Sequence, residues 1–471
     1  MNNNRHNILW IIFPIINNLI NLVVIKILSL YMNLGEFGDI NLLKSITSFT
    51  IPLASLGLQQ GLIRFLPQNN DEKNNFYNNI ISFSLFYYLI TSFFINFIVY
   101  IFRNQLKINS INFKMFVLLI IYTYVQLIGQ ILNAIDRAEL NYRKNNLYSF
   151  FVNIGFFILF LLISFNKNNI IFYYFLSYSI IYFIINLLYL FIFSKSYKIK
   201  LKIKINIKLI KSMLKYGIPI IGIMLSGSIL NLGDRFVINY LTTKEDLGMY
   251  SGMCSIANAI YLVVFLPISM YAYPKYMNIY KIEGINAVKK YLTGLANLIT
   301  NIYIGALFFL CIFNKFVIKL FLNVKFLGGY KSLLLIFIGN VFYSLYYIFS
   351  SEFYIKKDTK KLFKYILFVG VLNIILNIPF VKKFGITGAA LTTFICYTIL
   401  FIIIYRKQDL IKDFLDIRKT IINIIFLFIV MIVNIVLKSY ALPDLPRFVT
   451  LLVGYLIYFY YSNKNEILGL I

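Results

Sequence analysis

The sequence predicts an all-α integral membrane protein with about 14 transmembrane helices. Its 471 residues are 60% hydrophobic and 13% charged, whereas a soluble protein carries about 25% charged residues. The apolar residues gather in long runs, and a helix needs roughly 20 of them to cross a bilayer. The first run, 8–31, has Asn17, Asn18, Asn21 and Lys26 as its strongly polar members.

The expected spans follow one another with short connections, so no sizeable soluble domain is expected. The first run is longer than the core of a signal peptide and no small-residue cleavage site follows it, so we interpret it as a retained helix. The expected spans are 8–31, 42–63, 78–102, 115–135, 147–165, 169–194, 213–241, 250–272, 286–313, 332–355, 363–381, 385–405, 420–437 and 445–461.

The positive charge of the chain indicates membrane topology. The net charge is +28, from 45 Lys and Arg against 17 Asp and Glu. Because the basic residues lie in short connections between apolar runs, no nucleic-acid partner is expected. With the N-terminus in the cytoplasm, the connections on that side carry 29 Lys and Arg and those on the other side carry 13. The positive-inside rule therefore predicts that both termini are cytoplasmic.

A basic segment before the seventh expected span divides the chain. Lys198, Lys200, Lys202 and Lys204 alternate with apolar residues. This pattern is typical of a charge block that sets topology and contacts anionic lipid, or of a short amphipathic strand. We expect an N-terminal lobe at 1–194, a basic cytoplasmic linker at 195–212, a C-terminal lobe at 213–406 and two additional helices at 407–471.

A short motif recurs after the first and seventh expected spans. Residues 34–39 read Leu-Gly-Glu-Phe-Gly-Asp, and residues 245–250 read Glu-Asp-Leu-Gly-Met-Tyr. Aligning Gly38 with Gly248 makes the first and seventh spans equivalent, and it also aligns two Ser-Ile pairs. Internal duplication of this kind is common in secondary transporters, whose substrate site lies between the repeats.

Polar groups inside spans are the candidates for function, because a charge at the centre of a membrane helix costs about 2.5–3.5 kcal/mol. In the span 213–241, Ser228, Asn231, Arg235 and Asn239 are spaced 3, 4 and 4 residues apart. On an ideal helix they fall within an arc of about 80° and form one polar stripe. Asp234 points about 100° away from Arg235, and we expect a structural or coupling role for it.

Two cations lie at similar depths in the first and seventh spans. Lys26 is about five residues, and Arg235 about six, from the end of its span. We expect both to face a central cavity and to bind an anionic substrate, together with Ser228, Asn231 and Asn239. The alternative is that both side chains reach the outer headgroups, as long basic side chains near helix ends can do.

Few residues in the sequence are suited to catalysis or to holding a metal. Cys254, Cys311 and Cys396 lie in apolar runs without close spacing, and His6 is the only histidine. We therefore expect no disulfide, no metal site and no cofactor. A phosphate-binding G-x-x-x-x-G-K-[ST] motif is absent from the sequence, so direct ATP hydrolysis is not expected. We expect a transport protein rather than an enzyme.

Six segments together resemble the polysaccharide-biosynthesis exporters. These are the Wzx-type O-antigen flippases of the multidrug/oligosaccharidyl-lipid/polysaccharide exporter superfamily. The resemblance covers essentially the whole chain, and the order and spacing of the segments carry it more than any one of them. The segments are residues 35–38, 216–219, 230–236, 247–250, 373–379 and 383–390.

The resemblance implies a fold, a substrate and a location. The fold would be two six-helix lobes around a central cavity, plus two C-terminal helices, working by alternating access. The substrate would be an undecaprenyl-diphosphate-linked oligosaccharide, moved to the outer leaflet of the cell inner membrane for O-antigen or capsule biosynthesis. The partners would be this glycan lipid, membrane lipids and the polysaccharide polymerase machinery.

Other functions on the same fold stay open. A multidrug or cation exporter would favour acidic groups in the membrane, yet Asp234 is the only acidic residue well inside an expected span. A lipid II flippase is a further alternative. A polymerase or ligase would need a large outer loop, and none of the connections is long enough.

Overall fold

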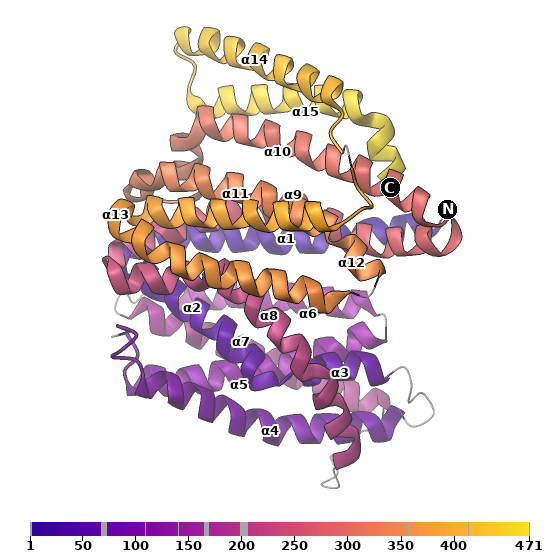
Figure 1. Ribbon diagram of the computed structural model, residues 1–471. Helices are drawn as coiled ribbons and strands as arrows, with labels where there is room; N and C mark the ends of the chain where they lie inside the picture. Colours follow the sequence, from indigo (N-terminus) through magenta and orange to yellow (C-terminus); the bar gives the residue numbers. More distant parts are fainter. Residues whose placement is uncertain are drawn as a thin grey trace. The chain divides into compact units, whose positions relative to one another are not determined.

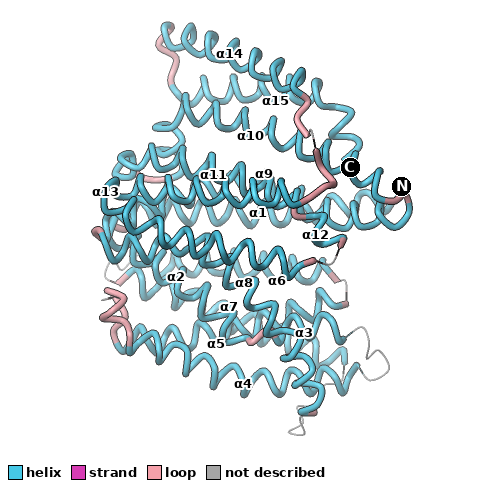
Figure 2. The backbone as a smooth tube through the Cα atoms, in the orientation of Figure 1, coloured by secondary structure: helices cyan, strands magenta, loops and turns pink. Residues whose placement is uncertain are grey.

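The computed structural model describes residues 2–66, 73–108, 110–139, 141–163, 169–197, 206–356, 358–412 and 414–470. This part of the chain consists of helices joined by short loops, without strands (Figure 2). The predicted all-α membrane fold is thereby confirmed. The alternating lysines of the predicted linker, at 198–205, lie outside the described residues.

Most of the expected spans correspond to helices in the structure. Nine helices of the described part are long and apolar enough to cross a membrane. The elements are α1 (Asn2–Tyr31), α2 (Leu34–Ser55), α3 (Leu58–Phe65), α4 (Lys73–Ile101), α5 (Phe113–Ala138), α6 (Tyr142–Ile163), α7 (Ile170–Tyr197), α8 (Ile207–Leu241), α9 (Lys244–Ile282), α10 (Ile285–Phe321), α11 (Tyr330–Phe349), α12 (Ser351–Ile355), α13 (Thr359–Lys407), α14 (Ile417–Ser439) and α15 (Asp444–Leu470).

The helices labelled in Figure 1 divide into two compact units by their contacts. The first unit comprises Met1–Val24 and Tyr31–Gly248, and the second comprises Ile25–Leu30 and Met249–Ile471. Helix α8, which carries the predicted polar stripe, belongs to the first unit. The lobe boundaries expected at 194 and 213 stay a prediction.

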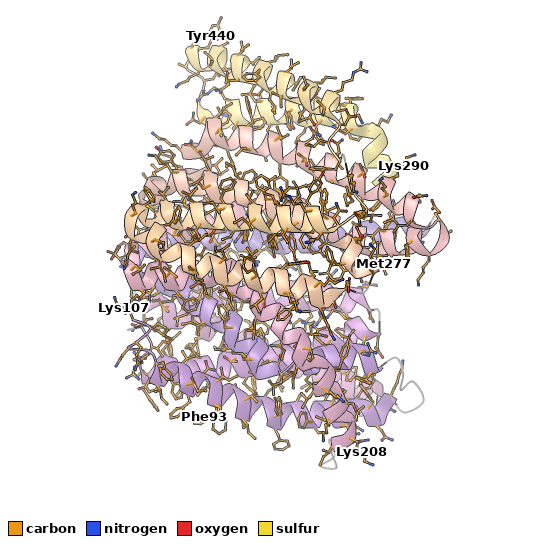
Figure 3. The ribbon with its side chains drawn as sticks, viewed as in Figure 1. Phe93, Lys107, Lys208, Met277, Lys290 and Tyr440 are labelled. Carbon is orange, nitrogen blue, oxygen red and sulfur yellow. The ribbon has the colours of Figure 1, made fainter. Side chains whose placement is uncertain are left out.

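Helix α5 is central to the first unit. It packs against α3, α4, α6 and α7, and two thirds of its most apolar stretch is buried. Tyr77 and Tyr88 of α4 are fully buried in the same core, with Leu127 and Ala134 of α5. By contrast, α4 also presents an apolar face outward, where Phe93 is exposed (Figure 3). Such a face is expected where a helix contacts lipid.

The expected span 42–63 is broken into α2 and α3. Leu56 and Gly57 adopt positive φ angles of 40° and 71°. At this break the backbone of α8 comes so close that a Cβ on Gly217 would lie 2.2 Å from the Gly57 carbonyl oxygen. Glycine is needed on both sides of this contact because any side chain would collide with backbone. The Tyr-Gly-Ile-Pro motif at 216–219 therefore serves helix packing.

The motif at 383–390 forms a tight helical hairpin in the second unit. Gly385 has φ 56° and ψ −139° and separates α13 into two helical halves. A Cβ on Gly388 would lie 2.1 Å from the Phe380 carbonyl oxygen, so the returning half passes directly over the end of the first. Helix α11 packs along α13. The expected boundary between the spans 363–381 and 385–405 falls at this turn.

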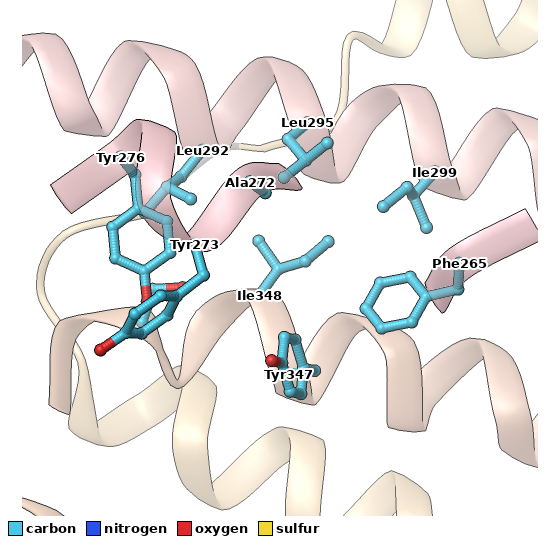
Figure 4. A pocket seen from close by; sticks show the side chains of 10 residues that line it. Phe265, Ala272, Tyr273, Tyr276, Leu292, Leu295, Ile299, Tyr347 and Ile348 are labelled. Carbon is cyan, nitrogen blue, oxygen red and sulfur yellow. The ribbon is translucent and has the colours of Figure 1, made fainter. Parts of the chain in front are cut away.

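The interior of the second unit is closely packed between α9, α10 and α11. Tyr276, Leu292 and Ile348 help to enclose a cavity of only about 10 Å³ (Figure 4). A cavity needs about 10–15 Å³ to hold one water molecule. The cavity that these described residues enclose is therefore too small for a substrate.

The two C-terminal helices are attached to α10 by a buried amide network. Asn423 of α14 donates to the Asn301 side-chain oxygen (3.1 Å), and the Tyr455 hydroxyl of α15 donates to the Asn423 oxygen (3.2 Å). At the start of α15, Arg447 donates to Asn434 (3.2 Å) and pairs with Asp444. Because polar groups buried in a membrane protein need internal partners, this network fixes α14 and α15 to the second unit.

The connection between α13 and α14 is anchored by one buried carboxylate. Glu352 of α12 accepts hydrogen bonds from the backbone N–H groups of Asp409 (2.7 Å) and Leu410 (2.8 Å). Glu352 also pairs with Lys356, and its hydrogen bond and negative charge raise the pKa of Lys356. Lys356 is exposed, so solvent screens this pair, whereas the two backbone bonds to Glu352 are shielded.

Replacing Glu352 by alanine is expected to destabilise the α13–α14 connection by about 2–3 kcal/mol, since hydrogen bonds to a charged group contribute about 1.5–3 kcal/mol. Limited proteolysis of the purified protein should then cut between residues 408 and 416. Lys356→Ala is the matched control and should leave the cleavage rate within twofold of wild type. Equal cleavage of wild type and the Glu352 variant would show that Glu352 does not anchor this segment.

Candidate functional site

The predicted polar stripe of α8 lies partly inside the first unit. Arg235 is 7% exposed, Asp234 3% and Asn239 5%, while Ser228 and Asn231 are half-buried. An Nη atom of Arg235 donates to the Asn231 carbonyl oxygen at 3.4 Å. The guanidinium group is therefore held along the face of α8 that the spacing predicted.

Asp234 contacts the backbone beside it. Its carboxylate oxygen accepts a hydrogen bond from the backbone N–H of Arg235 at 2.7 Å. This bond fixes the carboxylate next to the helix backbone. Its coupling role stays a prediction.

Asn239 connects α8 to the loop that follows α4. Its side-chain amide donates to the Leu106 carbonyl oxygen at 2.8 Å. In return, Lys107 (Figure 3) donates to the Tyr240 carbonyl oxygen at 2.9 Å and lies 4.6 Å from the centre of the Tyr240 ring. The C-terminal end of α8 is thus held by hydrogen bonds donated to the loop after α4 and received from it. Asn239 has a structural role in this contact.

A second cation, Lys44 of α2, accompanies Arg235 and was not among the predicted site residues. Helices α2 and α8 pack together, and the rings of Phe49 and Phe236 meet edge to face at 5.7 Å. Lys44 and Arg235 thus lie on two helices that pack against each other. The Lys44 ammonium lies 4.6 Å from the centre of the Tyr174 ring. We call Arg235 and Lys44 the cationic pair.

The sequence did contain a signal for Lys44. It is a charged residue inside an expected span, 42–63, and such residues are rare and often functional. Like-charged neighbours destabilise each other in a poorly solvated environment. An anion would be attracted by both cations, so the pair is suited to hold a negatively charged group.

Lys26 lies in the second unit and binds the end of a helix. Its ammonium donates to the carbonyl oxygens of Lys319 (2.6 Å) and Leu322 (2.7 Å). These carbonyls belong to the last turn of α10, whose final carbonyl groups have no partner within the helix. Lys26 thus stabilises the C-terminus of α10. Its predicted role in substrate binding stays a prediction.

Each copy of the repeated motif lies at the N-terminus of a helix, and the two helices are capped in the same way. At the start of α2, the Asn33 side chain accepts from the Glu36 backbone N–H (2.8 Å), and Glu36 accepts from the Asn33 N–H (3.0 Å). At the start of α9, Thr243 and Asp246 make the same reciprocal pair at 3.2 and 3.4 Å. Both are capping boxes.

The aligned glycines of these two copies touch each other. A Cβ on Gly38 would lie 3.0 Å from the Gly248 nitrogen, and a Cβ on Gly248 would lie 1.8 Å from the Leu34 carbonyl oxygen. Lys244 pairs with Asp39 across the same contact. The motif therefore serves to join the starts of α2 and α9, which explains why a small residue occurs at this position in both copies.

Asp136 is a second buried polar group that the sequence analysis did not single out. It was placed in the connection 136–146, but α5 continues to Ala138 and Asp136 is 1% exposed. Its carboxylate accepts a hydrogen bond from the Tyr189 hydroxyl of α7 at 2.6 Å. In the described part of the chain, no three His, Cys, Asp or Glu side chains are grouped so as to hold a metal ion.

Solved structures show which proteins share this fold. A structure of the lipid II flippase MurJ, in an inward closed conformation, is 20% identical, covers 98% of this chain and 100% of its own, and has a TM-score of 0.69. An inward-facing multidrug resistance MATE family transporter of the MOP superfamily is 15% identical, with coverage of 85% and 97% and a TM-score of 0.67. A MOP superfamily transporter from Pyrococcus furiosus is 14% identical, with coverage of 84% and 94% and a TM-score of 0.56.

Sequence comparison identifies the family. No curated protein matches the sequence. The family model described as polysaccharide biosynthesis protein matches residues 5–279, which is more than half of the chain. This match includes α8 with the polar stripe, the cationic pair and both copies of the repeated motif. The chain is a multi-pass membrane protein with the fold of MOP superfamily transporters, and it belongs to the polysaccharide biosynthesis protein family.

Proposed function

We propose that the protein is a flippase that moves an undecaprenyl-diphosphate-linked oligosaccharide from the cytoplasmic to the outer leaflet, for O-antigen or capsule biosynthesis. The observation that carries the proposal is the cationic pair on the packed helices α2 and α8 of a polysaccharide-biosynthesis family member. A diphosphate is anionic, and arginine and lysine are the residues that bind phosphate groups best.

In this proposal the diphosphate binds at Arg235 and Lys44, and the half-buried Ser228 and Asn231 offer hydrogen-bond partners on the same face of α8. The lipid tail stays in the bilayer while the glycan crosses with the protein, by alternating access. The residues do no covalent chemistry, so the protein acts as a transporter rather than an enzyme. A contact with the polysaccharide polymerase machinery would deliver the product to its next step.

A second candidate function is the export of lipid II itself. It is favoured by the lipid II flippase structure, which covers 98% of this chain. The distinction lies in the glycan, because the diphosphate and the polyprenyl tail are common to both substrates. Rescue of a bacterial strain depleted of its lipid II flippase would favour this candidate. The cationic pair disfavours a multidrug exporter of cations, which it would repel.

Disrupting the gene in its own host tests the proposal. We expect the lipid-linked glycan to accumulate on the cytoplasmic face of the inner membrane, and one surface polysaccharide to disappear. Normal surface polysaccharide together with new sensitivity to cationic drugs would instead assign the protein to the drug exporters. Reintroducing the intact gene should restore the polysaccharide and remove the accumulated lipid.

The proposed orientation, with both termini in the cytoplasm, makes a separate prediction. In a variant without the three native cysteines, a cysteine replacing the exposed Tyr440 (Figure 3) should react with an impermeant reagent from outside the cell. A cysteine replacing the exposed Ile282 should react only after the cells are opened. The reverse pattern would overturn the orientation derived from the Lys and Arg counts.

A further inference from the structure

Helices α6 and α7 of the first unit form a groove between them that is distinct from the polar stripe. We call it the α6–α7 groove, and its volume is about 580 Å³. Its apolar walls come from residues about one helical turn apart on each helix, namely Leu147 and Phe151 of α6 and Ile181, Ile185, Leu188 and Ile192 of α7. Residues at this spacing line one face of a helix.

The groove opens toward the outside of the unit. Phe151 is 55% exposed, Leu188 56% and Ile192 64%. In a membrane protein, exposed apolar side chains at this depth face lipid tails. The groove is therefore accessible from the bilayer.

The length of the groove matches one leaflet. It extends along α6 from Lys144 to Gly155, which corresponds to roughly 16 Å at about 1.5 Å per residue. Half of a bilayer's hydrocarbon core is about 15 Å. With the proposed orientation, Lys144 lies at the cytoplasmic headgroup level and Gly155 near the middle of the membrane.

Among the residues that the structure describes, Lys144 is the one charged residue that lines the groove. It is exposed at the first turn of α6, next to the exposed Arg143. Of the acidic groups near it, Asp136 accepts a hydrogen bond from Tyr189 and also attracts Lys144, and Glu139 lies 3.9 Å from Lys73. The ammonium of Lys144 is thus placed to meet a phosphate at the mouth of the groove.

The tyrosine hydroxyls along the groove are occupied by the protein. The Tyr148 hydroxyl donates to Asn186 at 2.6 Å, and Asn186 in turn donates to the Val125 carbonyl oxygen at 2.7 Å. Because these groups are satisfied, the interior of the groove offers contacts for hydrocarbon only. A ligand that fits has one apolar chain and one anionic group at its end.

We propose that the α6–α7 groove binds an anionic phospholipid of the cytoplasmic leaflet, with one acyl chain in the groove and its phosphate at Lys144. A phospholipid is the occupant that this geometry favours, because its anionic headgroup matches the exposed lysine at the mouth and the groove is as long as one leaflet. Basic pockets between membrane helices on the cytoplasmic side are known to bind anionic headgroups. The proposal holds whichever substrate the protein carries.

Native mass spectrometry of the full-length protein in mild detergent tests this. Phosphatidylglycerol and phosphatidylcholine are added separately, and bound lipid is counted. Wild type should bind phosphatidylglycerol in preference. Lys144→Gln should lower phosphatidylglycerol binding about fivefold, as expected for one basic residue near a headgroup, and should leave phosphatidylcholine binding unchanged.

Two further variants distinguish the contribution of the acyl chain to lipid binding from that of the Lys144 charge. Gly155→Leu should lower the binding of both lipids, because a Cβ there would meet the Ile181 side chain at 3.1 Å within the groove. Lys208→Gln removes another exposed lysine, at the start of α8 (Figure 3), and should change nothing. Lys144 is a surface residue, so its variant keeps the test valid even if the Gly155 variant does not fold.

Three outcomes would overturn the proposal. Equal binding of the two lipids by wild type would remove the role of the headgroup charge. Equal losses in the Lys144 and Lys208 variants would show a general effect of surface charge. A polyprenyl phosphate retained in place of phospholipid, and lost in the Lys144 variant, would assign the groove to the carrier lipid.

Discussion

Replacing Arg235 by alanine is expected to slow transport roughly 10- to 100-fold while leaving the protein inserted in the membrane. Arg235 is 7% exposed and is held on the polar face of α8 by its contact with the Asn231 carbonyl oxygen. Loss of a charge-assisted hydrogen bond to the diphosphate removes about 1.5–3 kcal/mol. Recovery of surface polysaccharide in a strain lacking the gene measures the effect.

Matched variants show whether charge or packing is responsible. Arg235→Lys keeps the charge and should retain part of the activity, and Lys44→Ala should impair transport as Arg235→Ala does. Lys215→Ala removes an exposed cation from the same helix, α8, and should be neutral. Wild-type polysaccharide levels with Arg235→Ala would remove the cationic pair from the account of substrate binding.

Replacing Gly248 by alanine is expected to destabilise the protein by about 3 kcal/mol. The new Cβ would lie 1.8 Å from the Leu34 carbonyl oxygen. This neighbour is backbone in the first turn of α2, so it cannot rotate away, and overpacking typically costs about 1–3 kcal/mol. The start of α9 would have to shift away from α2, and the Lys244–Asp39 pair would be lost with it.

Thermal unfolding of the purified protein in detergent measures this change. The control is Gly227→Ala in α8, where the new Cβ would meet no described atom within 4 Å beyond the neighbouring residues and backbone of its own helix. Alanine is favoured over glycine in a helix by up to about 1 kcal/mol, so this variant should be as stable as wild type or slightly more so. Equal stability of the Gly248→Ala and Gly227→Ala variants would mean that the contact between α2 and α9 is looser than in this structure.

The sequence located the helices well because each apolar run is long and its ends are charged. The span expected at 213–241 corresponds to α8 (Ile207–Leu241), and the turn expected between 381 and 385 occurs at Gly385. The break between α2 and α3 was not expected. It depends on the contact between Gly57 and Gly217, which are far apart in the sequence and meet only in the folded chain.

Residues of the site were harder to predict than helices. The periodicity of α8 predicts that Arg235 and Asn231 share one face, because spacing along a helix fixes which side chains are neighbours. Lys44 was not assigned because its place beside α8 depends on how α2 packs against that helix. The contact of Lys26 with the end of α10 likewise follows from tertiary structure, since its partners are about 290 residues away.

The most direct test of the proposed function is transport by the purified protein in proteoliposomes. An undecaprenyl-diphosphate-linked oligosaccharide from the host is incorporated, and its exposure to an impermeant glycosidase is followed over time. We predict that wild type makes the glycan of the inner leaflet accessible and that the Arg235→Ala variant does so at least tenfold more slowly. Accessibility that is the same with wild type, with the variant and with empty liposomes would contradict the assignment as a flippase.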